Sequence, residues 1–121
     1  MAPEVEIMYW LPHCSTCVKA KTFLEEHGVH VKATHDIKAE RLPKATVAKL
    51  AKAVGGADKL FSKRAMKYRS MGLHERDVTE TEMLELMVEE YTFIKRPVVV
   101  FKDEATLCGF SQKAYLNTIE G

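Results

Sequence analysis

Two cysteines, Cys14 and Cys17, lie at C-x-x-C spacing just after Pro12. The residues before Pro12 alternate in the manner of a strand, and apolar residues at helical spacing follow Cys17. The first thiol is therefore expected over the unsatisfied N–H groups of a helix start, whose partial positive charge favours a thiolate. Cys14 is then the candidate nucleophile. Cys17, one helical turn on, can attack an intermediate formed at Cys14 and release it as a Cys14–Cys17 disulfide.

A zinc site or simple packing would also account for this cysteine pair. A C-x-x-C pair is half of a typical zinc site, but no second pair follows it. The remaining candidate ligands have no matching spacing: Cys108, His13, His30 and His35. Packing would leave both thiols inert in the core. Redox chemistry is favoured over both because the pair lies at a strand-to-helix junction, and we expect neither a metal nor a cofactor.

The first third of the chain predicts the elements that position this pair. Val5 to Trp10 alternate like a strand, and helical spacing extends from the cysteines to Gly28, a typical residue just past a helix end. A second short strand follows at residues 29–34. Strand, helix and strand in this short space form a βαβ unit, which we assign to residues 1–35.

The rest of the chain predicts a helical middle and a second part of the sheet. Residues 36–95 carry an amphipathic helix near 47–54 and another behind a capping box at Thr79 to Glu82. Residues 96–121 predict a hairpin and a last helix, which is the order ββα. The simplest packing is an α/β fold with a four-stranded mixed sheet, a helical insertion between its halves, and all 121 residues in one domain.

Composition excludes several classes of protein. With 46% hydrophobic and 29% charged residues, the chain is globular and not disordered. Its longest apolar runs are a few residues each, far short of the roughly 20 that cross a bilayer. The first residues lack the basic region and apolar core of a secretory signal. We therefore expect a cytoplasmic protein, with no membrane attachment, whose three cysteines are thiols.

The net charge of +1 conceals a basic block. Residues 36–72 hold ten Lys and Arg against three acidic residues, whereas the remainder of the chain is acidic. The near-neutral total gives no reason to expect binding of nucleic acid. The block coincides with the helical middle and is a candidate docking face for a protein partner. The solvated side of ordinary amphipathic helices accounts for it equally well.

Several motifs accompany the cysteine loop in a fixed order. They are Tyr9 to Cys17, Phe23 to Gly28, Leu60 to Arg64, Arg96 to Val99, and Gly109-Phe110. In this order the chain resembles the arsenate reductase/Spx family, a branch of the thioredoxin-like fold. The resemblance implies a redox nucleophile at Cys14, an anion-holding residue at Arg96 and a cis proline facing the site at Pro97. It also implies an external thiol reductant, such as glutathione, glutaredoxin or thioredoxin.

Two branches of that family imply different functions. The chain departs from glutaredoxin-linked arsenate reductases because Val18 occupies an expected basic position, with Lys19 next, and a middle arginine falls at Ser62, two positions before Arg64. Each lost charge-assisted hydrogen bond to arsenate would cost about 1.5–3 kcal/mol. Spx-like members resemble the chain in the C-x-x-C pair, in Gly56 before a short helix, and in Arg64. In that branch the pair is an oxidation switch and the helical middle binds RNA polymerase.

The sequence therefore predicts a cytoplasmic thiol–disulfide redox protein in which Cys14 attacks or is oxidised and Cys17 resolves. An Spx-like regulator that binds RNA polymerase and an arsenate reductase with an external thiol donor are the alternatives. Lys19, Arg64 and Gly56 are candidates for holding an anion or a partner. We expect Cys108 to be a small buried residue and not a second redox partner.

Overall fold

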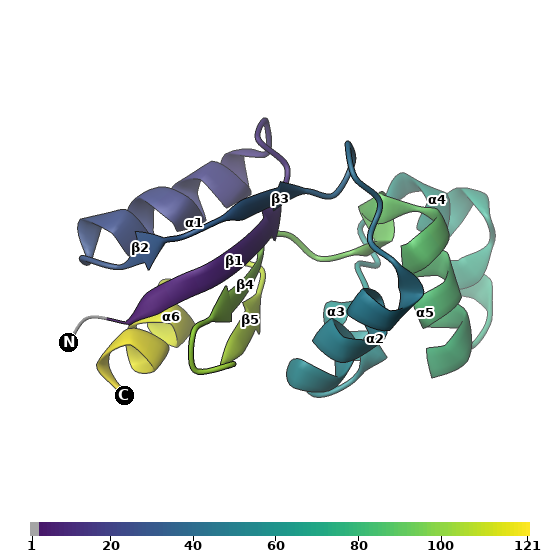
Figure 1. Cartoon of the computed structure of the whole chain (residues 1–121). Coiled ribbons are helices and arrows are strands. Elements are labelled where there is room, and N and C mark those ends of the chain that lie inside the picture. Colours follow the sequence, from purple (N-terminus) through teal and green to yellow (C-terminus); the bar gives the residue numbers. More distant parts are fainter. Residues whose placement is uncertain (1–2) are drawn as a thin grey trace. The chain divides into compact units, whose positions relative to one another are not determined.

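The computed structural model describes residues 3–121 of the chain. These residues fold as two compact units (Figure 1). One, which we call the sheet unit, comprises residues 3–40 and 96–121, and the other, the helical unit, comprises Arg41–Lys95. The helical unit thus begins and ends close to the predicted helical insertion at 36–95. The assignment of all 121 residues to one domain stays a prediction.

The sheet unit is built around its first strand. Its strands are β1 (Glu4–Trp10), β2 (His30–Val31), β3 (Thr34–Asp36), β4 (Val98–Phe101) and β5 (Thr106–Cys108). On one side, β1 pairs with β2 and β3 in parallel, and on the other it pairs with β4, which is antiparallel and carries β5 at the edge. The predicted βαβ and ββα orders and the mixed sheet are confirmed.

The sheet has five strands because the predicted strand at 29–34 is divided into β2 and β3. Both parts keep one register with β1, and Lys32 and Ala33 between them still form hydrogen bonds to it. The division faces the point where β1 carries an extra residue, Glu6, relative to β4. Such a bulge bends a strand and increases its twist, which interrupts regular pairing on both of its sides.

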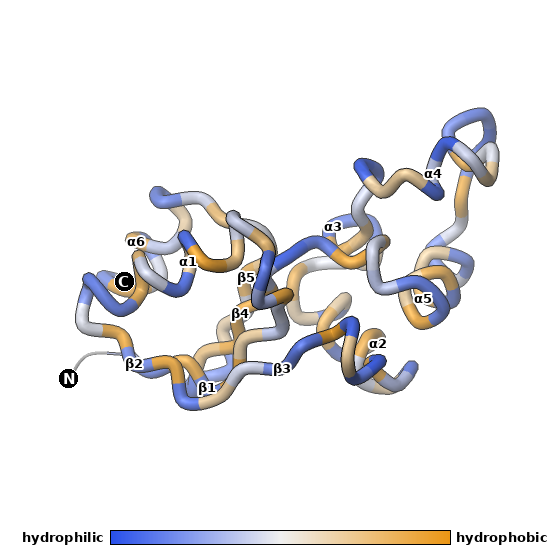
Figure 2. Tube along the Cα trace, turned by 90° about the horizontal axis from the view of Figure 1, so that it is seen from above, coloured by the Kyte–Doolittle hydropathy of each residue, from blue (hydrophilic) through white to orange (hydrophobic). Residues whose placement is uncertain are grey.

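Two helices share one hydrophobic core with the sheet. They are α1 (Ser15–Glu26) and α6 (Gln112–Glu120). The buried residues of this core are Val5, Met8, Ala20, Leu24, Val29, Val99, Phe101 and Tyr115. In Figure 2 the strand β4 carries the corresponding hydrophobic colour, and β1 carries it in part. Ser111 caps α6, where its hydroxyl accepts the Ala114 N–H at 3.3 Å.

The helical unit contains four α-helices in its described residues. They are α2 (Lys44–Ala53), α3 (Ala57–Leu60), α4 (Met66–Ser70) and α5 (Glu80–Glu89). The predicted capping box begins α5: Thr79 Oγ1 accepts the Glu82 N–H at 3.2 Å, and Glu82 Oε1 accepts the Thr79 N–H at 3.4 Å. A separate core includes Phe61 and Phe93, whose rings stack with centroids 5.1 Å apart.

No helix among residues 3–121 combines the length and the apolar character that a bilayer-spanning segment requires.

Candidate functional site

The backbone between β1 and α1 fixes the position of Cys14. The Cys14 N–H donates to the Leu11 carbonyl at 3.1 Å, and the Cys14 carbonyl accepts the Val18 N–H at 3.0 Å. Cys14 is the extended N-cap residue immediately before α1. The side chain of Cys14 is half-buried, whereas that of Cys17 is fully buried. The predicted placement of the first thiol at a helix start is thus confirmed.

Cys14 lies where a thiolate is stabilised. Partial burial opposes its ionisation, but this is outweighed by hydrogen bonds from the Cys17 thiol and from the backbone N–H groups of Cys17 and Thr16, together with the charge of Arg96. The pKa of Cys14 is therefore lower than that of an ordinary thiol. A lowered pKa increases the fraction of the nucleophilic form near neutral pH.

Cys17 lies where the neutral thiol is favoured. Burial raises its pKa to about 12, and the negative charge of Cys14 and the hydrogen bond to Cys14 act in the same direction. A hydrogen bond from the Leu11 backbone and the charge of Arg96 oppose this rise without cancelling it. Cys14 is thus the more readily ionised sulfur of the pair, and Cys17 donates a hydrogen bond to it, an arrangement compatible with an attacking and a resolving cysteine.

Arg96 is the cation that acts on both thiols. It lies two residues before the start of β4 and is half-buried, and its charge favours the ionised form of Cys14 and of Cys17. The Arg96–Pro97 peptide bond is cis, the isomer that the family resemblance implies. Lys19 lies exposed on α1, and neither it nor the exposed His13 contributes to the pKa of Cys14.

Two further residues, Cys108 and Tyr115, lie close to each other, and Tyr115 is also close to Cys17. Cys108 lies at the end of β5, where it pairs with Val98. Its side chain is half-buried and not fully buried as the sequence predicts. Tyr115 of α6 is 1% exposed, and burial raises its pKa, with smaller contributions from the charges of Cys17 and Cys108. The sequence predicts Tyr115 only as an apolar residue of the last helix. No local sequence pattern predicts the hydrogen bond of its hydroxyl group or its closeness to the cysteines.

The described side chains hold no evident metal site. Among residues 3–121, no three His, Cys, Asp or Glu side chains gather closely enough to bind a metal ion. Cys14 and Cys17 are reduced thiols, hydrogen-bonded to each other. The arrangement of these two residues can therefore exchange thiols and disulfides, and this chemistry needs only the two sulfurs and a nearby cation.

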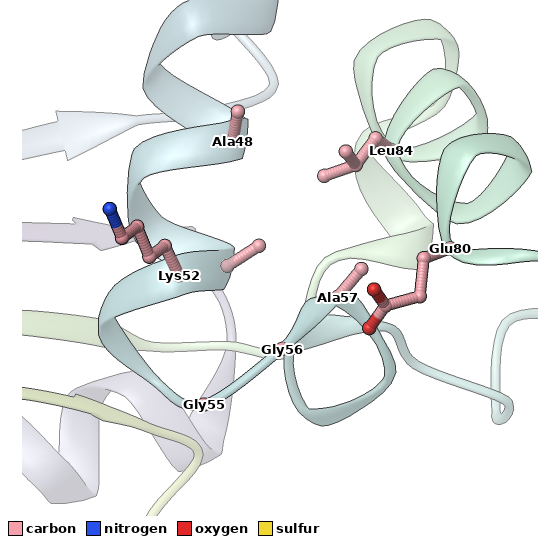
Figure 3. Close-up of a pocket in the computed structure, with 8 residues that line it drawn as sticks. Ala48, Lys52, Gly55, Gly56, Ala57, Glu80 and Leu84 are labelled. Atoms are coloured by element: carbon pink, nitrogen blue, oxygen red, sulfur yellow. The ribbon is translucent and has the colours of Figure 1, made fainter.

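Gly56 and Arg64 belong to the helical unit and not to the unit that carries the thiols. Gly56 lies beside an open cavity of about 480 Å³ between α2, α3 and α5 (Figure 3). Its lining is mostly small and apolar: Ala48, Ala51, Lys52, Gly55, Gly56, Ala57, Glu80 and Leu84. In Figure 3 the carboxylate of Glu80 lies over Ala57 and Gly56. Arg64 is exposed after α3.

Gly56 is required by its backbone as well as by its neighbours. Its φ of 138° lies in a region that residues with a side chain rarely adopt. An added Cβ would lie 2.7 Å from Asp58 Oδ1 and 3.2 Å from Glu80 Oε1. The glycine at this position therefore has a structural reason that needs no bound anion or partner.

Comparison with known proteins identifies the family. A model of the ArsC family matches residues 9–118, which is most of the chain and includes the cysteine pair, Arg96 and Pro97. The chain belongs to the ArsC family. The predicted resemblance to arsenate reductase and Spx proteins is thereby confirmed.

Three curated relatives differ in what is known of them. The uncharacterized protein YusI of Bacillus subtilis is 37% identical over 111 residues, covering 88% of this chain and 92% of its own. The regulatory protein MgsR of the same organism is 25% identical and covers 76% and 73%. The global transcriptional regulator Spx of Lactiplantibacillus plantarum is 21% identical and covers 78% and 71%.

Solved structures confirm the fold of this ArsC-family chain. The YFFB protein is 28% identical, with a TM-score of 0.77 over 93% of this chain and 97% of its own. An arsenate reductase (ArsC) related protein from Brucella melitensis is also 28% identical, with a TM-score of 0.70 over 92% and 91%. The predicted thioredoxin-like fold with a mixed sheet and a helical insertion is thus correct.

Proposed function

We propose that this ArsC-family protein is a thiol–disulfide redox protein in which Cys14 is the nucleophile and Cys17 the resolving thiol. The observation that carries the proposal is the opposite electrostatic environment of the two sulfurs. Hydrogen bonds and Arg96 favour the Cys14 thiolate, whereas burial keeps Cys17 protonated. Membership of the ArsC family supports the same chemistry. Because such a pair works in a reducing compartment, the proposal includes a cytoplasmic site of action.

The reaction begins at the Cys14 sulfur. The thiolate attacks one sulfur of an oxidised partner, forms a mixed disulfide and releases the other sulfur as a thiolate. Cys17 then gives its proton to the thiolate released in the first step. It attacks the Cys14 sulfur of the mixed disulfide and displaces the second sulfur of the partner. The Cys14–Cys17 disulfide forms, and the partner leaves as two reduced sulfurs. Two electrons have passed from the cysteine pair to the partner, and an external dithiol or glutathione returns them.

The change in charge at Cys14 makes the second step easier. The negative charge of Cys14 is one of the causes that raise the pKa of Cys17, after burial. Once the Cys14 sulfur is part of a mixed disulfide, this charge is gone. The ionisation of Cys17 therefore becomes more favourable at the stage at which Cys17 must attack. Arg96, whose charge favours both thiolates, stabilises each of the two nucleophiles in turn.

The proposal is tested by following each cysteine separately. The rate at which iodoacetamide alkylates Cys14 is measured against pH by peptide mass spectrometry, and it should reach half of its maximum at a pH below that of an ordinary thiol, about 8.5. Mild oxidation of the wild type should yield a Cys14–Cys17 disulfide. The Cys17→Ser variant should instead accumulate a mixed disulfide at Cys14.

Cys108→Ser is the matched control for the oxidation experiment. It should form the Cys14–Cys17 disulfide like the wild type, because Cys108 has no part in the proposed reaction. An ordinary alkylation midpoint at Cys14, together with the absence of the disulfide in the wild type, would refute the proposal. A disulfide that requires Cys108 would mean that Cys17 is not the resolving residue.

Binding to RNA polymerase is a second candidate function, and the names of the relatives favour it. MgsR is a regulatory protein and Spx a global transcriptional regulator. The basic block of the helical unit supports a docking role, because Lys49, Lys63 and Arg64 are exposed. The test is capture of purified RNA polymerase by immobilised protein, reduced and oxidised. Capture that depends on the oxidation state supports this function, and equal failure of both forms removes it.

Arsenate reduction is a third candidate, suggested by the Brucella melitensis relative. Arg96 is the residue of the sheet unit that we propose would hold the oxyanion beside Cys14. With glutathione and glutaredoxin supplied, turnover of arsenate that disappears in Cys14→Ser would establish the activity. Absence of turnover in the wild type would eliminate it and leave the thiol–disulfide chemistry untouched.

A further inference from the structure

Two consecutive hydrogen bonds connect α6 to the segment that carries Arg96. The Tyr115 hydroxyl donates to the Gly109 carbonyl at 2.7 Å. The Gly109 N–H in turn donates to the Pro97 carbonyl at 2.8 Å. Gly109 is thus held from both sides of its backbone, by a buried phenol and by the residue that follows Arg96. The hydroxyl group of Tyr115 is only two hydrogen bonds away from that segment.

Gly109 lies just beyond the regular pairing of the sheet, where these two bonds hold its backbone. It has a left-handed backbone with φ of 77°, and nothing lies within 4 Å of the point where a Cβ would stand. The regular pairing of β4 with β5 ends one residue earlier, at Val98 and Cys108. A glycine with a left-handed backbone, beyond the end of a ladder, has more conformational freedom than a residue with a side chain. The hydrogen bond from the Tyr115 hydroxyl therefore restrains the direction of its carbonyl.

Tyr115 itself has a fixed position. It is 1% exposed, and its ring packs edge-on against Phe110 at 5.0 Å and Phe23 of α1 at 6.1 Å between centroids. The ring therefore connects α6 to the helix that begins at the cysteine pair, while the hydroxyl reaches the Gly109 backbone. A rigid aromatic ring that carries one hydrogen-bond donor can hold a flexible turn with little loss of side-chain entropy.

We propose that the Tyr115 hydroxyl is a positioning group for Arg96, acting through the backbones of Gly109 and Pro97. This inference rests on the proposed function, because in that function Arg96 stabilises the thiolate of Cys14. A cation stabilises a thiolate only if it is held close to it, because the attraction falls with distance and with exposure to water. Loss of the hydroxyl should therefore weaken the effect of Arg96 on Cys14 while leaving the ring packing in place.

Tyr115→Phe tests the inference, because it removes one oxygen and keeps the ring. The alkylation rate of Cys14 is measured against pH in the variant and in the wild type. The midpoint should move to higher pH, and the rate near neutral pH should fall roughly two- to tenfold, the effect of one lost hydrogen bond. A merely structural role would lower the thermal midpoint of unfolding and leave the pH profile in place, and this result would overturn the inference.

Two further variants give the test its controls. Tyr68→Phe removes a phenol from the helical unit and should leave the pH profile of Cys14 unchanged. In an Arg96→Gln background, Tyr115→Phe should cause no further shift, because the cation that it positions is gone. An equal shift in both backgrounds would mean that Tyr115 acts on the thiol directly, which contradicts the inference. An ordinary wild-type midpoint would instead refute the proposed function itself, so the two failures are distinguishable.

Discussion

At the scale of single residues, the site depends on the different surroundings of two chemically identical side chains. Cys14 receives hydrogen bonds and a positive charge, and Cys17 is excluded from water. The first turn of α1 produces both effects. Its free N–H groups point at the Cys14 sulfur, and the Cys17 sulfur, which lies on the same turn, points into the core. From the spacing of the pair, the sequence predicts the placement of Cys14 at a helix start but not the burial of Cys17. Burial of Cys17 depends on the packing of the whole sheet unit, which the local pattern does not contain.

The alkaline stability of the protein should report the state of Cys17. Its pKa is raised in the folded protein, so between the ordinary thiol pKa and about 12 the folded state holds a proton that the unfolded state has lost. The free energy of unfolding should therefore fall as pH rises above about 8.5, by up to about 1.4 kcal/mol per pH unit. Urea unfolding at a series of pH values up to about 9, a full unit below the ordinary pKa of a tyrosine, measures the slope.

Cys17→Ala should flatten this slope, whatever its effect on stability at neutral pH. Cys108→Ala provides the matched comparison, and it should keep the wild-type dependence on pH. If the slope is the same in wild type and Cys17→Ala, then Cys17 ionises as an ordinary thiol and the electrostatic contrast between the two cysteines does not exist.

At the scale of elements, helix starts determine much of the fold. The start of α1 carries the thiol, and the start of α5 carries a capping box whose Glu82 also forms an ion pair with Arg76 at 2.8 Å. Both starts could be predicted, because caps are local sequence patterns. The division into β2 and β3 could not, since it faces a bulge at Glu6 that exists only once β1 is paired with β4.

Thr79→Ala should destabilise the helical unit by about 0.5–2 kcal/mol, the usual cost of losing a side-chain cap. The variant removes the acceptor of the Glu82 N–H and leaves the apolar side of α5 intact. Thr79→Ser retains the hydroxyl and should remain within a few tenths of a kcal/mol of the wild type. Denaturant unfolding compares the three proteins. Equal losses in Ala and Ser would show that the methyl group of Thr79, and not the cap, matters.

Gly56→Ala should be more damaging than Gly72→Ala. Gly56 combines φ of 138° with a 2.7 Å approach to Asp58, whereas Gly72 has φ of 71° and no atom within 4 Å of its Cβ position. Backbone strain alone costs of order 1–3 kcal/mol. Chemical unfolding should therefore rank Gly56→Ala as the less stable variant. The opposite order would mean that α3 shifts to accommodate the methyl group. Any loss of partner binding in Gly56→Ala must be weighed against this loss of stability.

At the scale of the whole molecule, the chain divides its chemistry and its charge between two units. The thiols and Arg96 belong to the sheet unit, and most of the basic block belongs to the helical unit. The sequence predicts this division because the hydrophobic period changes from strand to helix and back. It misses the link from Tyr115 to Pro97, because a hydrogen bond between distant residues depends on tertiary position and not on local pattern. Only the family resemblance points to Arg96, because a lone arginine before a strand has no distinctive local pattern.

The methionines of the molecule should be oxidised in the order of their exposure to solvent, whereas the oxidation of the cysteines also depends on the pKa of each thiol. Met66 is 89% exposed and Met71 51%, whereas Met8 and Met87 are at most 1% exposed. Peroxide should therefore convert Met66 first and Met71 next to sulfoxides, and should spare the buried pair until the protein unfolds. Peptide mass spectrometry after graded exposure to peroxide measures the order. Early sulfoxide at Met87 would mean that the helical core opens readily. Because Met66 gains an oxygen under the conditions that oxidise Cys14, redox-dependent binding should be repeated with Met66→Leu, so that a response of the helical unit is not assigned to the cysteine pair.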